Sequence, residues 1–364
     1  MLFADRGARS SVSRPTQLLL PPRRQAYWPG IFSPVDRNSD VSLEITTCVR
    51  SWHHRQTVLT RLGRYEVDHL LARGGMGEVY LGRVHGAHGF ERAVVIKTIR
   101  TELLADERAA LMFVDEARIA AGLHHRNIVQ ILDFDRFDGG AFLVTEYIEG
   151  CDLRAMLHHL RSPPRYDIAL TIVSELATGL EAAHEATAED GVPLNLVHRD
   201  VSPSNVLLGI AGEVKLADFG VAKARSRSYH TVSGTIKGKA PYMAPEQILG
   251  EPLDRRADVF GLGVLLFEVT TRTRLFSSKS DANAMKQILE GELPDPTQRR
   301  ADFPPELVPI VRRALARDRD ERYPTAKALV EDLDRVAQHR RWSLSRTVVG
   351  ELVQKIRGRA AGAA

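Results

Sequence analysis

His198-Arg199-Asp200-Val201-Ser202-Pro203-Ser204-Asn205 is the stretch that decides the fold, and eighteen residues after its aspartate stands Asp218-Phe219-Gly220. Between these two motifs lie the apolar runs Val206-Leu207-Leu208 and Val214-Lys215-Leu216. Two short runs of this kind with a glycine-containing connection predict a small hairpin. The hairpin would bring both motifs to the same end.

The polar residues of the two motifs suit phosphoryl transfer. That reaction requires positioning, neutralisation of phosphate charge and a carboxylate that orients the attacking hydroxyl. Asp200 can accept the hydroxyl proton, while Asn205 and Asp218 can supply oxygen ligands to Mg²⁺. The alternative is a pair of unrelated turns that each contain an aspartate, and the spacing of the motifs weighs against it.

Two further parts of such a site lie upstream. The cluster Gly74-Gly75-Met76-Gly77-Glu78-Val79 stands between strand-like runs, and its glycines would let backbone amides approach phosphate oxygens. A turn without a ligand is the alternative. Lys97 ends an apolar strand and is expected to pair with phosphates. Glu116, nineteen residues further on in a helical segment, would hold the ammonium, with Asp115 as the local competitor.

Strand patterns come first along the chain, and helical patterns follow. The strands are expected near residues 65–71, 78–81, 93–97, 128–134 and 141–147, with a helical segment near 107–123. Apolar residues at helical spacing then recur at 167–187, 256–270, 281–291, 305–317 and 324–337. This order predicts an α+β fold with two lobes.

The set of motifs resembles the protein kinase superfamily, most closely the bacterial eukaryotic-like (Hanks-type) Ser/Thr protein kinases. The resemblance covers residues 65–337, about three quarters of the chain. It implies a bilobal fold, with a small β-rich N-lobe with one main helix at 65–147 and a larger, mainly helical C-lobe at 148–337. It also implies transfer of the γ-phosphoryl group of ATP to protein Ser/Thr hydroxyls, with Mg²⁺ as the metal and Mn²⁺ as an alternative.

The resemblance also assigns a nucleotide site. Thr145-Glu146-Tyr147-Ile148 matches the hinge, where adenine bonds to backbone groups of Glu146 and Ile148 and Thr145 is the gatekeeper. Asp152 matches a position that contacts ribose. The residues expected to bind the nucleotide are Leu71, Ala72, Arg73, Gly74, Gly75, Met76, Gly77, Glu78, Val79, Lys97, Thr145, Glu146, Ile148 and Asp152.

Further matches lie in the C-lobe. Ala244-Pro245-Glu246 resembles the motif that closes the activation segment, and Arg322 matches the arginine that pairs with its glutamate. Asp258 matches the helix aspartate that anchors the catalytic loop, and Arg199 an arginine that binds a phosphorylated activation loop. Autophosphorylation there, with self-association, has the candidate acceptors Ser226, Ser228, Thr231, Ser233 and Thr235, of which the last three are favoured because Gly234 stands between them.

The chain departs from the family pattern at three positions. Ala72 replaces the first glycine of G-x-G-x-x-G, which predicts a looser nucleotide cover. Ser202 stands where kinases acting on Ser/Thr usually carry a lysine, and Lys239 stands where they usually carry a threonine. We hypothesise a reciprocal exchange in which Lys239 delivers its ammonium to the site; an exposed loop lysine is the alternative. The candidate catalytic residues are Lys97, Glu116, Asp200, Asn205, Asp218 and Lys239.

Composition restricts the other classes of protein. A formal net charge of +4 does not argue for a nucleic-acid partner. The two cysteines, Cys48 and Cys151, lack metal-ligand spacing, which favours a reducing cytoplasm. No apolar run approaches the roughly 20 residues that span a bilayer, so no integral membrane segment is expected.

The two ends of the chain carry different patterns. Residues 1–60 mix Pro, Ser and Arg without periodicity, which predicts a disordered basic N-terminal extension. Residues 338–364 are expected to form a C-terminal tail with a short amphipathic helix that packs on the C-lobe, the alternative being a membrane or partner helix.

Two rival functions remain open. A nucleotide-binding pseudokinase scaffold gains support from Ala72 and Ser202, but the presence of all the other catalytic candidates argues against it. A small-molecule kinase shares the lysine and the two aspartates, yet such enzymes usually lack a long activation segment and the Ala-Pro-Glu motif.

Overall fold

The computed structural model describes residues 60–73, 77–99, 117–137, 140–188, 190–219, 239–277 and 280–361. All of them belong to the compact unit Glu44–Ala364. The expectations for the extension before residue 60, for residues 74–76, for Glu116 and for the candidate phosphorylation sites within 220–238 lie outside the described residues.

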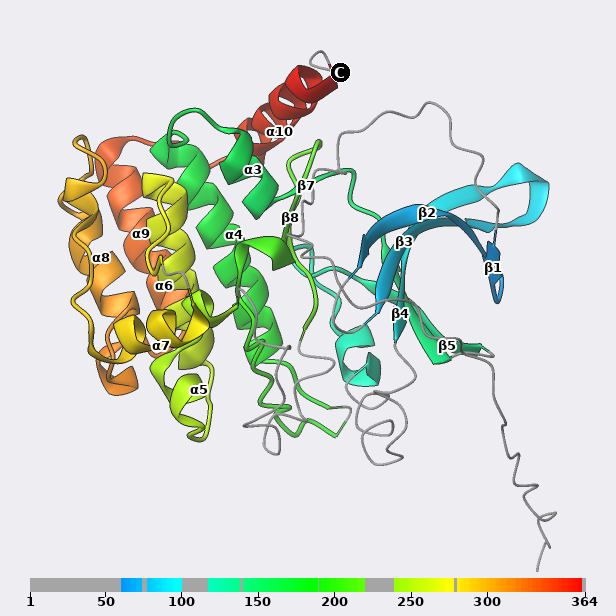
Figure 1. Cartoon of the computed structure of the whole chain (residues 1–364), viewed down its shortest axis with the longest axis horizontal. Coiled ribbons are helices and arrows are strands. Elements are labelled where there is room, and N and C mark those ends of the chain that lie inside the picture. The colour runs from blue at the N-terminus through cyan, green and yellow to red at the C-terminus, as the bar shows by residue number, and fades with distance from the viewer. Residues whose placement is uncertain are drawn as a thin grey trace, which may run out of the picture. The chain divides into compact units, whose positions relative to one another are not determined.

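Among its described residues, the N-lobe contains an antiparallel sheet of six strands in the order β1-β2-β3-β4-β6-β5 (Figure 1). Residues 117–121 are helical. The strands are β1 (Thr60–Leu62), β2 (Tyr65–Arg73), β3 (Glu78–His85), β4 (Glu91–Ile99), β5 (Ile131–Phe137) and β6 (Gly140–Glu146).

Alternation along β4 decides which way Lys97 faces. Val94 and Ile96 are buried and pack with Phe142 and Val144 of the neighbouring strand β6. Because successive side chains of a strand point to opposite faces, Lys97 lies on the face away from this core. The apolar residues of β4 therefore orient the lysine that the sequence singles out.

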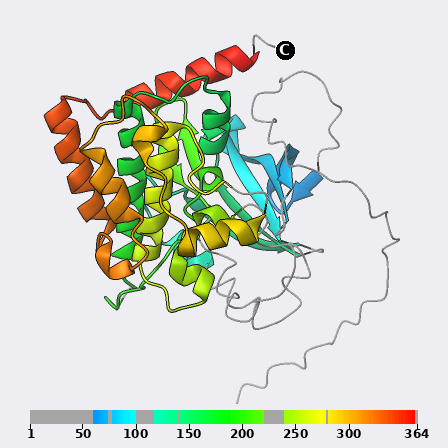
Figure 2. The same ribbon diagram turned by 60° about the vertical axis from the view of Figure 1, so that its left-hand side comes forward.

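The C-lobe is mainly helical, and Figure 2 shows its helices from a second side. Its long helices match the predicted segments closely, because their apolar residues recur at helical spacing. The helices are α3 (Leu153–His159), α4 (Tyr166–His184), α5 (Pro245–Leu249), α6 (Arg256–Thr271), α7 (Asp281–Glu290), α8 (Leu307–Ala314), α9 (Ala326–Arg340) and α10 (Arg346–Ala361).

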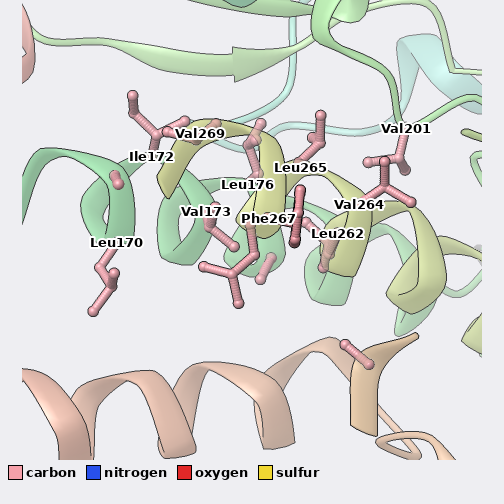
Figure 3. Packing of buried hydrophobic residues seen from close by; sticks show 14 of the residues in the cluster. Leu170, Ile172, Val173, Leu176, Val201, Leu262, Val264, Leu265, Phe267 and Val269 are labelled. Atoms are coloured by element: carbon pink, nitrogen blue, oxygen red, sulfur yellow. The ribbon is translucent and has the colours of Figure 1, made fainter. Parts of the chain in front are cut away.

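Helix α6 lies at the centre of the C-lobe core, and Val259–Val269 is buried throughout. Its side chains interleave with those of α4, and Val201 of the catalytic loop approaches the same helix (Figure 3). The approach is close because Gly261 has no side chain, and a Cβ there would lie 2.8 Å from Cβ of Val201. The central helix thus supports the catalytic loop directly.

The predicted hairpin is confirmed. β8 (Val206–Gly209) pairs antiparallel with β9 (Val214–Leu216), with Val206 opposite Leu216, and β7 (Gly150–Asp152) completes a sheet of three strands. The motif that ends just before β8 and the motif that begins just after β9 therefore lie at the same end of the hairpin.

Helix α10 packs beside this small sheet and on α3 and α4 (Figure 2). Val349, Val353 and Ile356 are buried against the C-lobe core. The helix comes close to the β8–β9 turn, where a Cβ on Gly212 would lie 2.2 Å from the carbonyl oxygen of Arg346. Its apolar face is therefore covered by the C-lobe itself.

Candidate active site

A buried carboxylate holds the catalytic loop. Asp258 of α6 accepts the backbone amides of His198 and Arg199, each at 2.8 Å, and its Oδ2 also lies 2.8 Å from Nε2 of His184. Burial alone would raise the pKa of Asp258, but the hydrogen bond and charge of His184 and the bonds from the loop lower it below the ordinary value. The predicted anchoring role of Asp258 is confirmed.

The loop backbone is strained at two functional positions. Arg199 has φ 66° and Asp218 has φ 60°, in the left-handed region that side chains rarely adopt. His198 joins the two motifs: its Nε2 donates to the carbonyl of Ala217 at 3.0 Å, and its Nδ1 accepts from the amide of Asp200 at 3.2 Å. These two bonds hold Asp200 close to the residue that precedes Asp218.

Asn205 is oriented by three bonds. Its side-chain Nδ2 donates to the carbonyl of Asp200 at 2.8 Å, its amide donates to the carbonyl of Ser202 at 2.9 Å, and its carbonyl accepts from the amide of Ala217 at 2.8 Å. Because the side-chain nitrogen Nδ2 donates to Asp200, the side-chain oxygen of Asn205 is the atom that can bind a hard cation such as Mg²⁺. The donor set fits such an ion.

The structure brings Lys97 to Asp218. Nζ of Lys97 lies 2.8 Å from Oδ2 of Asp218. This ion pair joins the N-lobe sheet to the end of the β8–β9 hairpin. Desolvation would raise the pKa of Asp218, but the charge and hydrogen bond of Lys97, with a further contribution from Lys239, lower it. An ionised Asp218 is the state that binds a metal ion.

The nucleotide cover lies next to Lys97 in the sheet. Val79 of β3 is the cross-strand neighbour of Lys97, and it also pairs with Ala72 of β2. Arg73 and Glu78 form an ion pair at 2.9 Å. The described residues of the expected cover thus lie in β2 and β3, beside the part of β4 that carries Lys97, and β4 continues two residues beyond this lysine to Ile99.

The hinge contains a contact that sequence reasoning missed. The carboxylate of Glu146 accepts from Nζ of Lys215 at 2.7 Å and from the amide of Gln130 at 2.8 Å. The amide of Glu146 donates to the carbonyl of Gln130 at 3.0 Å. Lys215 lies in β9, three residues before Asp218, so this pair links the hinge to the strand that leads into Asp218. No local pattern in the sequence predicts it.

Asp152 has a structural partner in addition to its expected role. Its Oδ1 accepts the amide of Ala155 at 2.6 Å and so caps the first turn of α3. Burial raises the pKa of Asp152. An aspartate directly before an apolar helical segment is a cap signal that the sequence analysis overlooked.

A second lysine reaches the catalytic loop. Nζ of Lys239 lies 2.6 Å from Oδ2 of Asp200, and the side chain of Asp200 is only 8% exposed. Ser202 is buried, and its hydroxyl lies 3.2 Å from that of Ser204. The ammonium beside Asp200 therefore comes from the segment that precedes Ala244.

The predicted pair between Arg322 and Glu246 is confirmed. Two nitrogens of Arg322 donate to the two carboxylate oxygens at 2.6 and 2.7 Å, and both side chains are buried. The remaining donors of the guanidinium bond to backbone carbonyls of Ala316, Arg256 and Arg317. A buried ion pair with all its donors satisfied holds the end of the activation segment against the C-lobe.

The protein kinase domain family matches residues 65–345, and the chain belongs to that family. The predicted family and the predicted bilobal fold are therefore confirmed. The crystal structure of the Mycobacterium tuberculosis PknI kinase domain has a TM-score of 0.58 and 25% sequence identity, and it covers 77% of this chain and 99% of that chain. This family uses ATP with a divalent metal, generally Mg²⁺.

Two relatives of the chain have names that state different acceptor residues for the phosphoryl group. The tyrosine-protein kinase MasK of Myxococcus xanthus is 44% identical over 280 residues, 76% of this chain and 43% of that protein. The serine/threonine-protein kinase PknB of Mycolicibacterium smegmatis is 35% identical over 280 residues, 75% of this chain and 43% of that protein. The chain thus spans less than half the length of these relatives. Among its described helices, none is long and apolar enough to cross a membrane.

Proposed function

We propose that this protein is a serine/threonine protein kinase that transfers the γ-phosphoryl group of ATP to protein hydroxyls. One observation carries the proposal: Lys97 is paired with Asp218 at 2.8 Å, and Asp218 follows the hairpin that also presents Asp200 and Asn205. A cation, a proton acceptor and two metal-binding oxygens thus come from one connected set of hydrogen bonds. The pseudokinase alternative has no comparable support.

In the proposed mechanism, Asp200 orients the acceptor hydroxyl and takes its proton. The acceptor oxygen forms a bond to the γ-phosphorus as the bond from that phosphorus to the leaving oxygen of ADP breaks. Asp258 keeps the loop that carries Asp200 in place through the amides of His198 and Arg199. The base therefore needs little reorganisation when the hydroxyl arrives.

Asn205 and Asp218 are the proposed ligands of Mg²⁺, with Mn²⁺ as an alternative. The metal neutralises phosphate charge when it is bound. Asp218 offers an ionised carboxylate and Asn205 a side-chain oxygen whose direction is fixed by its bond to Asp200. Lys97 is proposed to hold phosphates, supported by Glu116, which lies outside the described residues.

The hinge is proposed to bind adenine through the carbonyl of Glu146 and the amide of Ile148, beside Thr145 as gatekeeper. The amide of Glu146 already donates to Gln130, and its carbonyl accepts from the hydroxyl of Thr145 at 3.4 Å. A carbonyl oxygen has two lone pairs, so it can accept a second bond from the base. Asp152 is proposed to contact ribose with the oxygen that does not cap α3. The strand residues around Ala72 and Val79 would cover the phosphates.

Serine and threonine are the proposed acceptors, because Pro203 follows the pattern of kinases that act on these hydroxyls. Tyrosine is the second candidate, because the relative named a tyrosine-protein kinase is 44% identical. Acid hydrolysis of labelled product followed by separation of phosphoamino acids decides between them. Phosphotyrosine as the main product would replace the Ser/Thr assignment.

Arg199 supports a proposal of activation by phosphorylation. Its Nε is buried and has no hydrogen-bond partner among the described residues. A phosphate on Thr231, Ser233 or Thr235 would supply acceptors for that guanidinium. Autophosphorylation between two copies, and a cytoplasmic location, belong to the same proposal.

The test is an in vitro assay with labelled ATP and Mg²⁺, followed by phosphosite mapping, on the wild type beside Asp200→Asn. Removal of the base is expected to lower the rate by about 10²–10⁴-fold. Equal thermal midpoints of the two proteins would show that the substitution leaves the fold intact. A wild type that binds Mg·ATP but labels neither itself nor any protein substrate would support the scaffold alternative instead.

A further inference from the structure

The activation segment supplies a cation to the proposed base. Lys239 directly precedes the short helix Ala240–Tyr242, and its ammonium lies 2.6 Å from the carboxylate of Asp200. The lysine is 41% exposed, whereas the aspartate is 8% exposed. The ammonium of a partly exposed lysine thus lies on a buried carboxylate, whereas a loop lysine without a function would extend its ammonium into water.

Several contacts fix the segment that carries Lys239. Ala240 is fully buried, and the amide of Tyr242 donates to the carbonyl of Lys239 at 3.0 Å. Gln247 then ties the segment to the catalytic loop: its Oε1 accepts the amide of Ala244 at 2.9 Å, and its Nε2 donates to the carbonyl of Arg199 at 2.9 Å. The position of Lys239 is therefore set relative to the residue next to Asp200.

Downstream of Asp200, the catalytic loop contains no cationic side chain. From Asp200 to Asn205 the loop contains no lysine or arginine, and Ser202 directs its hydroxyl to Ser204 at 3.2 Å. Lys97 is already paired with the other carboxylate, Asp218. Negative charge on a phosphoryl group that is transferred to a hydroxyl held by Asp200 would therefore meet the ammonium of Lys239.

We propose that Lys239 is a catalytic residue, whose ammonium holds the γ-phosphoryl group beside Asp200 during transfer. The inference rests on the proposed kinase function and deepens it. It makes the cation part of the activation segment instead of part of the catalytic loop. A segment displaced from Asp200 would then remove a catalytic charge.

Lys239→Met tests the charge, because methionine keeps most of the length of the stem. We expect kcat to fall by about 10²-fold or more, as for loss of one preorganised donor to a transition state. The double variant Ser202→Lys with Lys239→Met returns an ammonium from the catalytic loop and should recover at least tenfold of the loss. Lys286→Met on α7, a lysine with a side chain 74% exposed, is the matched control and should match the wild type.

Nucleotide affinity provides a readout that does not depend on turnover. Calorimetric titration with Mg·AMP-PNP and with Mg·ADP compares ligands that differ in the γ-phosphoryl group. Lys239→Met should weaken AMP-PNP about tenfold and leave ADP within about twofold, since a hydrogen bond to a charged group is lost only with the first ligand. Thermal midpoints establish that each variant is folded.

The outcomes separate the inference from the function on which it rests. Wild-type kcat in Lys239→Met, or an equal change in affinity for both nucleotides, would overturn the role of Lys239. A loss of kcat that the double variant does not recover would also overturn it. If the wild type and Asp200→Asn are equally inactive, the kinase proposal itself fails, and the two titrations still report whether Lys239 senses the γ-phosphoryl group.

Discussion

Glu268 is the carboxyl group whose environment makes the sharpest quantitative prediction. It lies in α6 with 3% of its surface exposed, and it accepts from the hydroxyl of Tyr242 at 2.9 Å and from the amide of Leu275 at 3.2 Å. Burial raises its pKa to about 7, although both hydrogen bonds and the charge of Arg274 act in the opposite direction. The group therefore holds a proton in the folded protein over a range in which the unfolded chain has lost it.

The sign of the pH effect follows from this difference. Between the ordinary value of 4.5 and about 7, the unfolded state ionises at Glu268 while the folded state stays protonated, so stability falls as the pH rises and levels off above 7. At about 1.4 kcal/mol per pH unit, the whole effect is about 3 kcal/mol. About 2 kcal/mol of it should fall between pH 5.5 and pH 8.

Glu268→Gln removes the ionisation and keeps the shape. The amide can accept from the amide of Leu275 and donate to the hydroxyl of Tyr242, so most of the local hydrogen bonding survives. We expect the free energy of unfolding to decline less in the variant than in the wild type between pH 5.5 and pH 8, by about 2 kcal/mol. The variant should therefore be the more stable protein at pH 8.

The assay is urea unfolding followed by tryptophan fluorescence at the two pH values, because the linear extrapolation gives the free energy directly. Glu290→Gln on α7, whose side chain is 68% exposed, controls for loss of a carboxylate as such. If the free energies of unfolding of the wild type and of Glu268→Gln change equally between pH 5.5 and pH 8, the raised pKa of Glu268 is refuted.

Three further predictions concern the contacts that hold the site together. Asp258→Asn removes the charge that accepts hydrogen bonds from the catalytic-loop amides. We expect the unfolding free energy, measured by urea unfolding, to fall by about 2–3 kcal/mol, and kcat, measured from initial rates, to fall at least tenfold. Unchanged rates would contradict the anchoring role. Arg322→Met leaves the carboxylate of Glu246 buried without its partner and should lower stability by about 3–5 kcal/mol, part of which Glu246→Gln in the same chain should restore. Gly212→Ala, at φ +89° and with its Cβ 2.2 Å from the carbonyl oxygen of Arg346, should loosen α10; trypsin digestion as slow as in the wild type would rule this out.

Local patterns in the sequence predicted much of the fold. The long helices of the C-lobe followed from apolar spacing. Helix α6 is buried throughout Val259–Val269 because its apolar residues cover every side. The catalytic hairpin was predicted from two short apolar runs, since its strands are neighbours along the chain. Each of these elements forms between residues that lie close together along the chain.

Resemblance to a family extended the prediction to distant pairs. The contacts of Asp258 with the loop amides, and of Arg322 with Glu246 across 76 residues, were expected on that basis and are present. Periodicity alone would not have paired them. The role of Asp152 as the cap of α3 was visible in the sequence and was overlooked.

What the sequence determined by itself is the order of strands and helices and the chemical types available at the two motifs. Only the tertiary structure decided that Lys215 binds the hinge carboxylate of Glu146, that Lys239 contacts Asp200, and that burial raises the pKa of Glu268. The physical reason is range: spacing along the chain records which residues share a strand or a helix face. Ion pairs and desolvation depend on which separate elements pack against each other, and that is settled when the whole core forms.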